Sequence, residues 1–581
     1  SHGKLDRAAL PAPAARTADT VRLPGSAREE VLCGLFAELL DIGQAGADDD
    51  FFRLGGDSIM AIQLAARART AGLVFSPHDV FTVRTPARLA VLARTPEGDA
   101  PAEEDTGTGR LPLTPVMHWW REQVRDTATF TQSMLFPLAP GTGLAAIEEA
   151  VSVLTARHAA LRMRLVCEDD TGWELRVPEE SAPSAARAVR VSVPADADLH
   201  SRATELARTV TLRPEDGEMV RAVWLDPGSG RPGALLLTVH HLAVDGFSWR
   251  VLGQELAAAL DGRSADDAAP TGTASFTRWS RLLSREAALR LDELPWWERQ
   301  LADETARLAY VPAAGGRRET LTFDLDPDLT RSVLLTLPGA FNCRPDAVML
   351  TALTAAAVQR RGSGSSLVVH LEGHGREAIS APVDVSGTVG WFTTQYPVRL
   401  DLGAASVVPG GRPGEALKCV KEQLLAVPSG GLGWGLLRYL HPETGPALAA
   451  LPAPDVRFNY LGRFAAADAA GGRLLEPGPD AVPLAHTLEV DVLAREENGE
   501  PVLEASFSYP SGVFTEDGMR ALAGAWSEAL RVLADHCGPD GAAVHAPSDF
   551  PLVDLTGDQL ELLAQEMDFG DLDTADEEDQ R

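Results

Sequence analysis

The spacing of apolar residues changes along the chain and predicts two kinds of structure. Between residues 26 and 94, apolar positions recur three or four apart, and Ser26 with Glu29 forms a capping box, so we predict a small helical bundle there. Beyond Leu111, alternating or continuous apolar runs predict strands, and longer stretches of helical period predict helices among them. The strands are expected at 232–241, 365–375, 488–496 and 501–510, and the helices at 143–165 and 516–536. The larger region is therefore expected to be α/β.

Segments without periodicity suggest the domain boundaries. Residues 1–25 and 96–110 are rich in Ala, Pro, Gly and acidic residues, which is typical of linkers. The region 111–548 is too long for one core, so we predict two lobes, at about 111–280 and 281–548. The tail, 549–581, ends in a run of acidic residues.

Composition and charge exclude several functions. Against 52 Lys and Arg stand 83 Asp and Glu, a formal net charge of −31, which disfavours binding to nucleic acid or to an anionic membrane. The 5 cysteines show no CxxC spacing, so we expect neither a disulfide framework nor a zinc site. No signal peptide, membrane span, metal-ligand cluster or glycine-rich nucleotide loop is recognisable, and a cytoplasmic location is expected.

A serine at a helix start is the first candidate for chemistry. Ser58 lies in "DDDFFRLGGDSIMAIQLAARAR", between a glycine pair and a helical pattern. By itself this position also suits an ordinary N-cap serine. The whole run resembles the peptidyl carrier proteins of nonribosomal peptide synthetases, and residues 26–95 would form their four-helix bundle. The resemblance implies that a phosphopantetheinyl transferase attaches 4′-phosphopantetheine to Ser58, where the helix dipole would favour the phosphodiester.

Two flanking motifs suggest neighbouring domains. "GKLDRAAL", which contains Lys4, resembles the end of an adenylation domain, so residues 1–25 are expected to be the end of such a domain and a linker. Part of the acidic tail resembles the segment by which synthetases dock to the next one. The implied partners are an upstream adenylation domain and the condensation domain of the following module.

The second candidate for chemistry is "TVHHLAVDGFSW", residues 238–249, in which a strand ends in two adjacent histidines. Neighbouring strand residues point to opposite faces, so only one histidine can face a given cavity. The run resembles the HHxxxDG signature of the chloramphenicol-acetyltransferase-like superfamily. Four later runs resemble motifs of its epimerization domains, and the resemblance spans residues 111–548: "LEGHGRE", "TVGWFTTQYPVRL", "VPSGGLGWG" and "VRFNYLGRF".

The resemblance implies the inversion of an α-carbon held as a thioester. Such a reaction needs one group to remove the α-proton and another to return a proton on the opposite face. His241 and Glu372 are the residues implied, and which is acid and which is base stays open. Each ends an apolar run, so both are expected to face an interior where desolvation would raise a carboxyl pKa. The alternative for Glu372 is an exposed loop carboxylate.

The remaining motif residues are expected to support this pair. His240 would brace the strand, and Asp245 would form an ion pair with Arg157 or Arg162. Gly246 would permit a turn or a close approach that a Cβ would block.

Two residues of the "VRFNYLGRF" run, Asn459 and Tyr460, have alternative expected roles. They would hydrogen-bond the thioester oxygen or a proton relay, or else simply pack in a strand.

The expected function is therefore that of an isomerase. The enzyme would convert an L-aminoacyl or peptidyl thioester on the carrier to an L/D mixture during antibiotic peptide biosynthesis in a bacterium. Two alternatives stay open: a condensation-type acyltransferase, in which His241 activates an amine, and an inactive domain of the same fold that recruits a partner.

Overall fold

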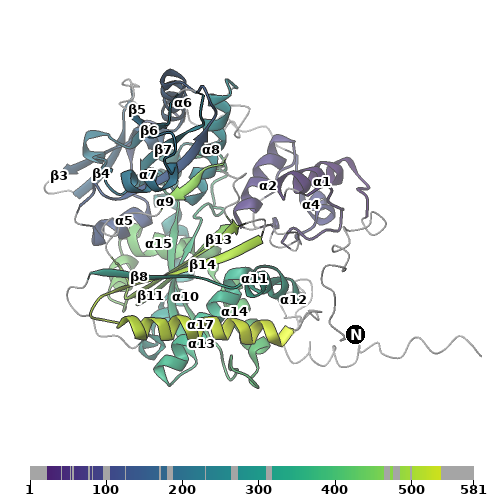
Figure 1. Ribbon diagram of the computed structural model, residues 1–581. Helices are drawn as coiled ribbons and strands as arrows, with labels where there is room; N and C mark the ends of the chain where they lie inside the picture. Colours follow the sequence, from purple (N-terminus) through teal and green to yellow (C-terminus); the bar gives the residue numbers. More distant parts are fainter. Residues whose placement is uncertain are drawn as a thin grey trace, which may run out of the picture. The chain divides into compact units, whose positions relative to one another are not determined.

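The computed structural model describes the following residues: 22–40, 42–52, 54, 56, 58–75, 79–80, 83–95, 105–124, 126–168, 172–179, 188–228, 230–263, 273–308, 317–463, 471–475, 484–497 and 500–537. The chain divides into two compact units, 1–104 and 105–581 (Figure 1). The motif around Lys4, most of the linker 96–110 and the acidic tail 549–581 lie outside the described residues.

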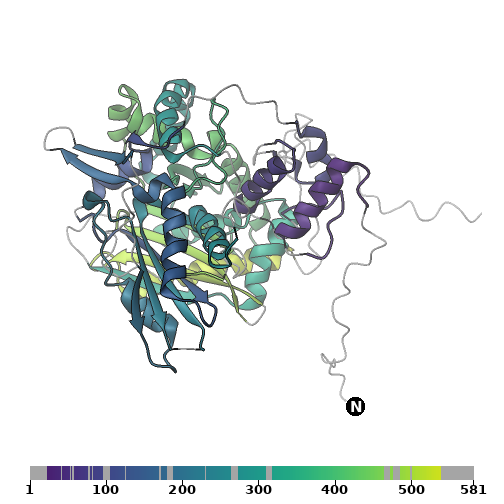
Figure 2. The same ribbon diagram turned by 90° about the horizontal axis from the view of Figure 1, so that it is seen from above.

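The first unit is helical. Figures 1 and 2 show its helices, drawn in purple, packed against one another. One half of the predicted capping box is present, since the Ser26 side chain accepts a hydrogen bond from the backbone of Glu29; the Glu29 carboxylate accepts one from Gly25, one residue before the N-cap. The helices whose full bounds the structure describes are α1 (Ala27–Leu39), α2 (Ser58–Thr70) and α4 (Pro86–Leu92), and the core of the unit includes Leu32, Phe36, Phe51, Leu64 and Leu89.

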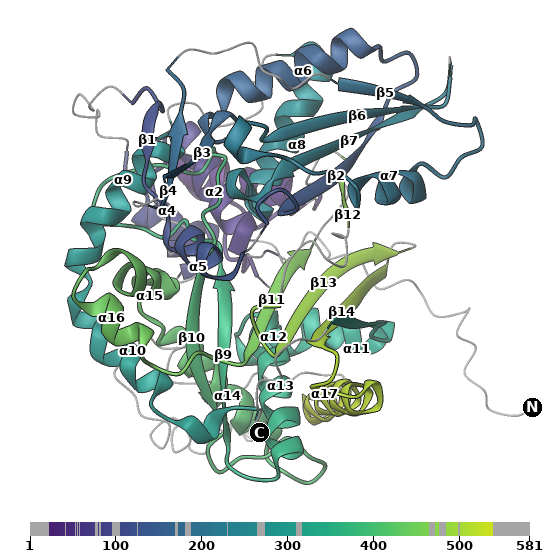
Figure 3. The same ribbon diagram turned by 90° about the vertical axis from the view of Figure 1, so that its left-hand side faces the viewer.

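The C-terminal part of the second unit is built on a six-stranded sheet, shown in Figure 3. Its strand order is β10 (Thr394–Asp401), β9 (Ser366–Gly373), β11 (Val456–Arg463), β13 (Leu488–Glu497), β14 (Glu500–Pro510) and β8 (Arg318–Asp324). Apolar residues alternate with polar ones along β11 and β13, so one face of the sheet is apolar. The main helices that share its core are α11 (Pro327–Arg331), α13 (Pro345–Arg361), α14 (Pro413–Leu425) and α17 (Glu516–Cys537).

The N-terminal part holds a five-stranded sheet with helices on both sides (Figure 3). Helix α7 (Leu199–Ala207) packs on one face, while α6 (Leu144–Arg157) and α8 (Gly246–Leu260) pack together on the other. The strand order is β12 (Arg473–Leu475), β2 (Thr131–Leu138), β7 (Gly233–His240), β6 (Val220–Asp226) and β5 (Ala188–Ser192). Strand β12 comes from the C-terminal half of the chain, so the two lobes are not consecutive in sequence.

A smaller three-stranded sheet completes the second unit. Its order is β1 (Gly109–Leu111), β4 (Gly172–Val177) and β3 (Arg164–Glu168), and all of its pairings are antiparallel. Three more helices belong to this unit (Figure 3). In the chain, α5 (Pro115–Gln123) precedes β2, while α9 (Phe276–Glu286) and α10 (Leu294–Leu301) lie between β7 and β8.

All four predicted strands are present, as is the helix predicted at 516–536. The helix predicted at 143–165 is shorter, because α6 ends at Arg157. His158 has an extended backbone there, and its buried ring lies 2.7 Å from the carboxylate of Glu255 on α8. The chain then forms a 3-10 turn and enters β3. The apolar spacing that predicted the longer helix therefore extends beyond α6 into the turn and the strand.

Candidate functional site

The two adjacent histidines diverge because β7 ends between them. His240 is the last residue of the strand and is fully buried. Its Nε2 lies 2.9 Å from the carbonyl oxygen of Thr127, and its Nδ1 accepts a hydrogen bond from the backbone of Leu242. Burial lowers the pKa of His240 to about 4, so the ring is neutral at pH 7. This geometry is compatible with the bracing role predicted for His240.

This buried ring predicts a dependence of stability on pH. His240 takes up a proton near pH 6.5 in the unfolded chain but only near pH 4 in the folded protein, so the free energy of unfolding should fall as the pH drops through that window. A shift of this size corresponds to at most about 3 kcal/mol. His240→Gln can still donate to Thr127, and urea unfolding at several pH values should show a slope reduced by up to about one proton. An unchanged slope would mean that His240 is not neutral in the folded state.

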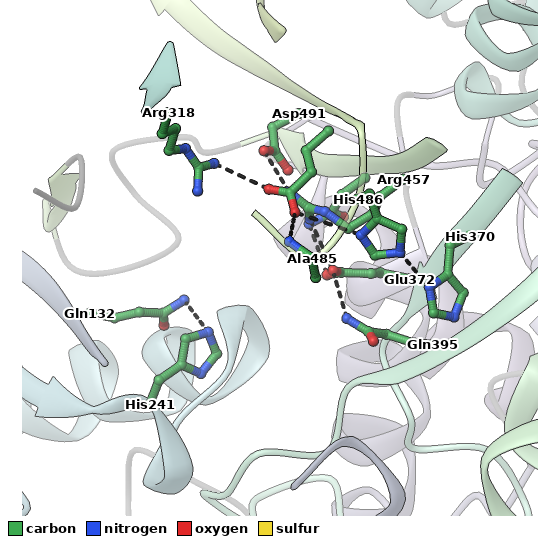
Figure 4. Close-up of polar contacts among 12 residues, drawn as sticks. Gln132, His241, Arg318, His370, Glu372, Gln395, Arg457, Ala485, His486 and Asp491 are labelled. Atoms are coloured by element: carbon green, nitrogen blue, oxygen red, sulfur yellow. Dashed lines mark hydrogen bonds and ion pairs between the residues drawn. The ribbon is translucent and has the colours of Figure 1, made fainter. Parts of the chain in front are cut away.

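His241 begins the 3-10 turn that follows the strand. Its ring stacks on Phe130, with centroids 4.6 Å apart, and lies 4.8 Å from the ring of Trp391. Its Nε2 lies 2.9 Å from the amide nitrogen of Gln132 (Figure 4). Burial lowers the pKa of His241, while backbone groups and the charges of Glu372 and Asp245 act in the opposite direction.

Asp245 connects the histidine turn to the C-terminal lobe. It caps α8 by accepting hydrogen bonds from Ser248, and it also accepts one from the backbone of Phe392. Its ion-pair partner is Arg376, at 3.5 Å, with both side chains buried.

The partners predicted for Asp245 are therefore wrong. Arg157 pairs with Glu255, and Arg162 donates to the carbonyl oxygens of Thr155 and Ala156. Arg157 is the last residue of α6 and Arg162 lies in the 3-10 turn that follows, whereas Arg376 reaches the start of α8 from a loop more than a hundred residues later.

The expectation for Gly246 is also wrong. Gly246 is the first residue of α8, its φ is not positive, and a Cβ built on it would meet no atom within 4 Å. Close approach instead occurs at Gly375, where a Cβ would lie 1.6 Å from the carbonyl oxygen of Phe392 and where φ is +68°.

Glu372 lies near the end of β9, and its side chain is 18% exposed. Its two carboxylate oxygens accept hydrogen bonds from three side chains: Arg457 at 2.9 Å, Asn459 at 3.0 Å and Gln395 at 3.2 Å (Figure 4). These residues come from the neighbouring strands β11 and β10, with Gln395 directly opposite Glu372 in register. The carboxylate is therefore fixed in one orientation by the sheet.

The surroundings of Glu372 differ from the apolar interior that was expected. A guanidinium and two side-chain amides donate hydrogen bonds to its carboxylate. Since Glu372 is ion-paired and mostly covered, it is not an exposed loop carboxylate either.

Behind Glu372, the polar face of the sheet carries a cluster of charges that was not predicted, although one member, Arg457, lies in the "VRFNYLGRF" run. Arg457 also contacts Asp491 at 2.8 Å and Glu489 at 3.4 Å, and Arg318 reaches Glu489 at 3.2 Å. Register explains the cluster, because Arg457 lies opposite Glu489 across the β11–β13 pair. The signal was present in the alternation of "VRFNY" and "LEVDV", which places these charges on one face.

The two predicted residues on β11 lie in different surroundings. Asn459 donates its amide to Glu372, whereas Tyr460 packs against the hydrophobic core of the C-terminal lobe. Successive strand residues point to opposite faces, which accounts for the separation.

The loop that follows Glu372 joins the two lobes. The Arg376 guanidinium lies over the rings of Phe247 and Phe392 and donates to the carbonyl oxygens of Val385 and Thr388. Glu377 lies 3.3 Å from the ring of His374, and burial raises the pKa of Glu377 to about 8. Glu377 therefore holds a proton at pH 7.

In the carrier unit, Ser58 is the first residue of α2. Gly56 precedes it where the chain passes the ring of Phe51, and a Cβ on Gly56 would lie only 2.4 Å from that ring. The turn thus requires glycine at position 56, and Ser58 begins the helix that follows it.

Two absences concern only the described part of the chain. There, no group of three or more His, Cys, Asp or Glu side chains is arranged to hold a metal ion. Within the same ranges, no helix combines the length and apolar character that a membrane crossing requires.

Comparison with known families identifies both units. The family model described as "Condensation domain" matches residues 108–555, and the one described as "Phosphopantetheine attachment site" matches residues 30–91. The second match contains Ser58.

Whole-chain relatives are components of peptide synthetases. The chain is 33% identical to one of the linear gramicidin synthase proteins of Brevibacillus parabrevis and 31% identical to surfactin synthase subunit 1 of Bacillus subtilis, over 96% and 97% of its own length. It spans only 11% and 16% of these relatives.

Solved structures agree with this assignment. The epimerization domain from the third module of tyrocidine synthetase B aligns with a TM-score of 0.64 and 27% identity, over 76% of this chain and 99% of that one. The X-domain from teicoplanin biosynthesis, at 22% identity and a TM-score of 0.56 over 76% and 97% of the two chains, shares the fold. The protein thus belongs to the condensation-domain family of the nonribosomal peptide synthetases and carries a phosphopantetheine attachment domain ahead of its chloramphenicol-acetyltransferase-like domain.

Proposed function

We propose that this protein epimerizes the α-carbon of an aminoacyl or peptidyl group held as a thioester on its carrier domain. The observation that carries the proposal is the fixed carboxylate of Glu372, which lies across the site from His241 (Figure 4). Inversion of an α-carbon requires two proton-handling groups, whereas amide formation can proceed with the histidine alone.

The two groups come from different lobes, and each is held by its own contacts. His241 lies at the end of β7 and is clamped between aromatic rings, while Glu372 is fixed by donors from β10 and β11. The Asp245–Arg376 pair connects the turn of one to the loop of the other. Such mutual positioning is what proton transfer on opposite faces of one carbon demands.

Glu372 is suited to act as the base. Arg457, Gln395 and Asn459 all donate to its oxygens, which holds the carboxylate in one orientation from which it would accept the α-proton. His241 would then protonate the opposite face of the carbon. In the reverse direction the two residues exchange these roles.

The carrier would supply the substrate. When attached to Ser58, phosphopantetheine provides the thiol whose thioester makes the α-proton of the substrate more acidic. Tethering the substrate within the same chain raises its effective concentration at the site. A phosphopantetheinyl transferase and the neighbouring adenylation and condensation domains are the partners that this role requires.

The similarity to an epimerization domain of known structure supports the proposal, as do the four motif runs that follow the histidines. The rival is amide formation by the same fold. The two reactions can be distinguished by giving the loaded protein an acceptor aminoacyl thioester and analysing the products. The proposal expects recovery of the donor residue as an L/D mixture without a new amide, and a dipeptide of unchanged configuration would overturn it.

Ser58→Ala should abolish the transfer of phosphopantetheine to the protein, because no other residue is proposed to accept it. Intact-mass measurement after incubation with coenzyme A and a transferase checks this directly. The variant should still epimerize an aminoacyl thioester presented on a separate carrier domain. A persistent mass shift in the variant would place the attachment at another residue.

A further inference from the structure

Gln132 lies between two side chains with different hydrogen-bonding abilities. Its Oε1 is 2.8 Å from the indole nitrogen of Trp249, and its Nε2 is 2.9 Å from Nε2 of His241. Gln132 is on β2, Trp249 is on α8 and His241 follows β7, so three elements of the N-terminal lobe meet at this amide.

Trp249 determines how the amide of Gln132 is oriented. An indole N–H can only donate a hydrogen bond, so the atom of Gln132 that faces it must be the carbonyl oxygen. Trp249 is 1% exposed and is held by the packing of α8, which makes it a rigid anchor. The opposite orientation would bring two N–H donors together and leave the amide oxygen beside the imidazole.

This orientation in turn determines the proton state of His241. The NH2 group of Gln132 can only donate, so Nε2 of His241 accepts and bears no proton. A neutral imidazole then carries its proton on Nδ1. The ring is prevented from turning over by Phe130, which stacks on it in a nearly parallel plane at an interplanar angle of 8°, and by Trp391.

The other charged and titratable groups around the ring come from three elements. Glu372 on β9 and Asp245 at the start of α8 favour the protonated ring, and His240 at the end of β7 is its neighbour in the chain. Gln132 is uncharged, and its N–H group faces Nε2 of His241. It therefore disfavours a proton on that nitrogen, whereas the two carboxylates favour the protonated ring.

We propose that Gln132, oriented by Trp249, is a positioning residue that keeps Nε2 of His241 unprotonated in the resting protein. Before His241 can act as the acid opposite Glu372, it must take up a proton from water at Nε2, and this requires the amide of Gln132 to move aside. The inference deepens the proposed function, since it concerns the proton state of one of the two groups assigned to it. It also assigns a physical role to the tryptophan that follows Asp245-Gly246.

Gln132→Glu tests the proposal, because it keeps the shape of the side chain and reverses its hydrogen bonding. A carboxylate can accept from both Trp249 and Nε2–H of His241. In full-length protein labelled with nitrogen-15 at histidine, the wild type should show His241 protonated on Nδ1. In the variant, the proton of the neutral ring should lie on Nε2. The affinity of the ring for a further proton should rise at least tenfold, which moves its titration to higher pH by one unit or more. His241→Asn identifies the signal.

Two further variants keep the test decisive. Trp249→Phe removes the anchoring N–H and should move the tautomer and the titration in the same direction by a smaller amount. Gln123→Glu adds the same charge at an exposed position at the end of α5 and should change neither. Identical His241 signals and titration in the wild type and in Gln132→Glu would overturn the proposal. Because this readout needs no substrate, a failure of the proposed epimerization would appear separately, as absent α-carbon exchange with the predicted tautomer intact.

Discussion

Glu372→Gln should reduce α-carbon proton exchange by about 10²- to 10⁴-fold, the range typical for loss of a general acid–base group. The amide retains the shape of the side chain but cannot take up the α-proton. Arg457 keeps its contacts with Asp491 and Glu489, so we expect the fold to survive the change. Deuterium uptake at the α-carbon of a loaded aminoacyl group measures the effect.

Glu377→Gln is the matched control for this prediction. Glu377 lies five residues later, and burial raises its pKa to about 8, so at pH 7 it is protonated and an amide closely mimics it. Exchange in this variant should stay close to the wild-type rate. Equal losses in both variants would indicate that the loop, and not the carboxylate of Glu372, is what the reaction needs.

Asp245→Asn should lower the free energy of unfolding by about 3–5 kcal/mol, because it leaves the buried guanidinium of Arg376 without its counter-charge. Burial already lowers the pKa of Arg376 to about 10 with Asp245 present. Since the pair connects the histidine turn to the loop after Glu372, activity should fall as well. Urea unfolding provides the measurement.

The exposed pair between Arg438 and Glu122 offers the comparison. Glu122→Gln should cost less than about 1 kcal/mol, as is usual for ion pairs at the surface. A double variant, Asp245→Asn with Arg376→Met, should lose less stability than the sum of the two single changes, because neither charge is then left alone. Additive losses would show that Asp245 and Arg376 do not act as a pair.

Sequence patterns predicted the parts of the fold that depend on local periodicity. The strands that carry His240 and Glu372 are present because each is a run of buried apolar residues bounded by a polar turn. The capping box at Ser26 is equally local. The position at which α6 ends was not predicted, because it coincides with the contact between His158 and Glu255, which lies 97 residues further along the chain.

Only those residues of the site that had been singled out within a recognised motif could be predicted from the sequence. Arg457 lies in the "VRFNYLGRF" run but was not singled out as a site residue, and Glu489 and Asp491 lie outside the four motif runs. Their meeting depends on the pairing of β11 with β13. The partner of Asp245 depends in the same way on a loop of the other lobe. Gln132 reaches His241 only because β2 pairs with β7 in a register that places Thr131 opposite His240. Pairing between distant segments is what single-sequence reasoning lacks.

The most direct test of the proposed function begins with the protein loaded through Ser58 with either the L- or the D-aminoacyl pantetheine, in deuterated water. The proposed mechanism predicts that both preparations converge on the same L/D mixture and that the α-carbon gains deuterium in each. Retention of the starting configuration in both preparations, with the α-hydrogen unexchanged, would contradict it.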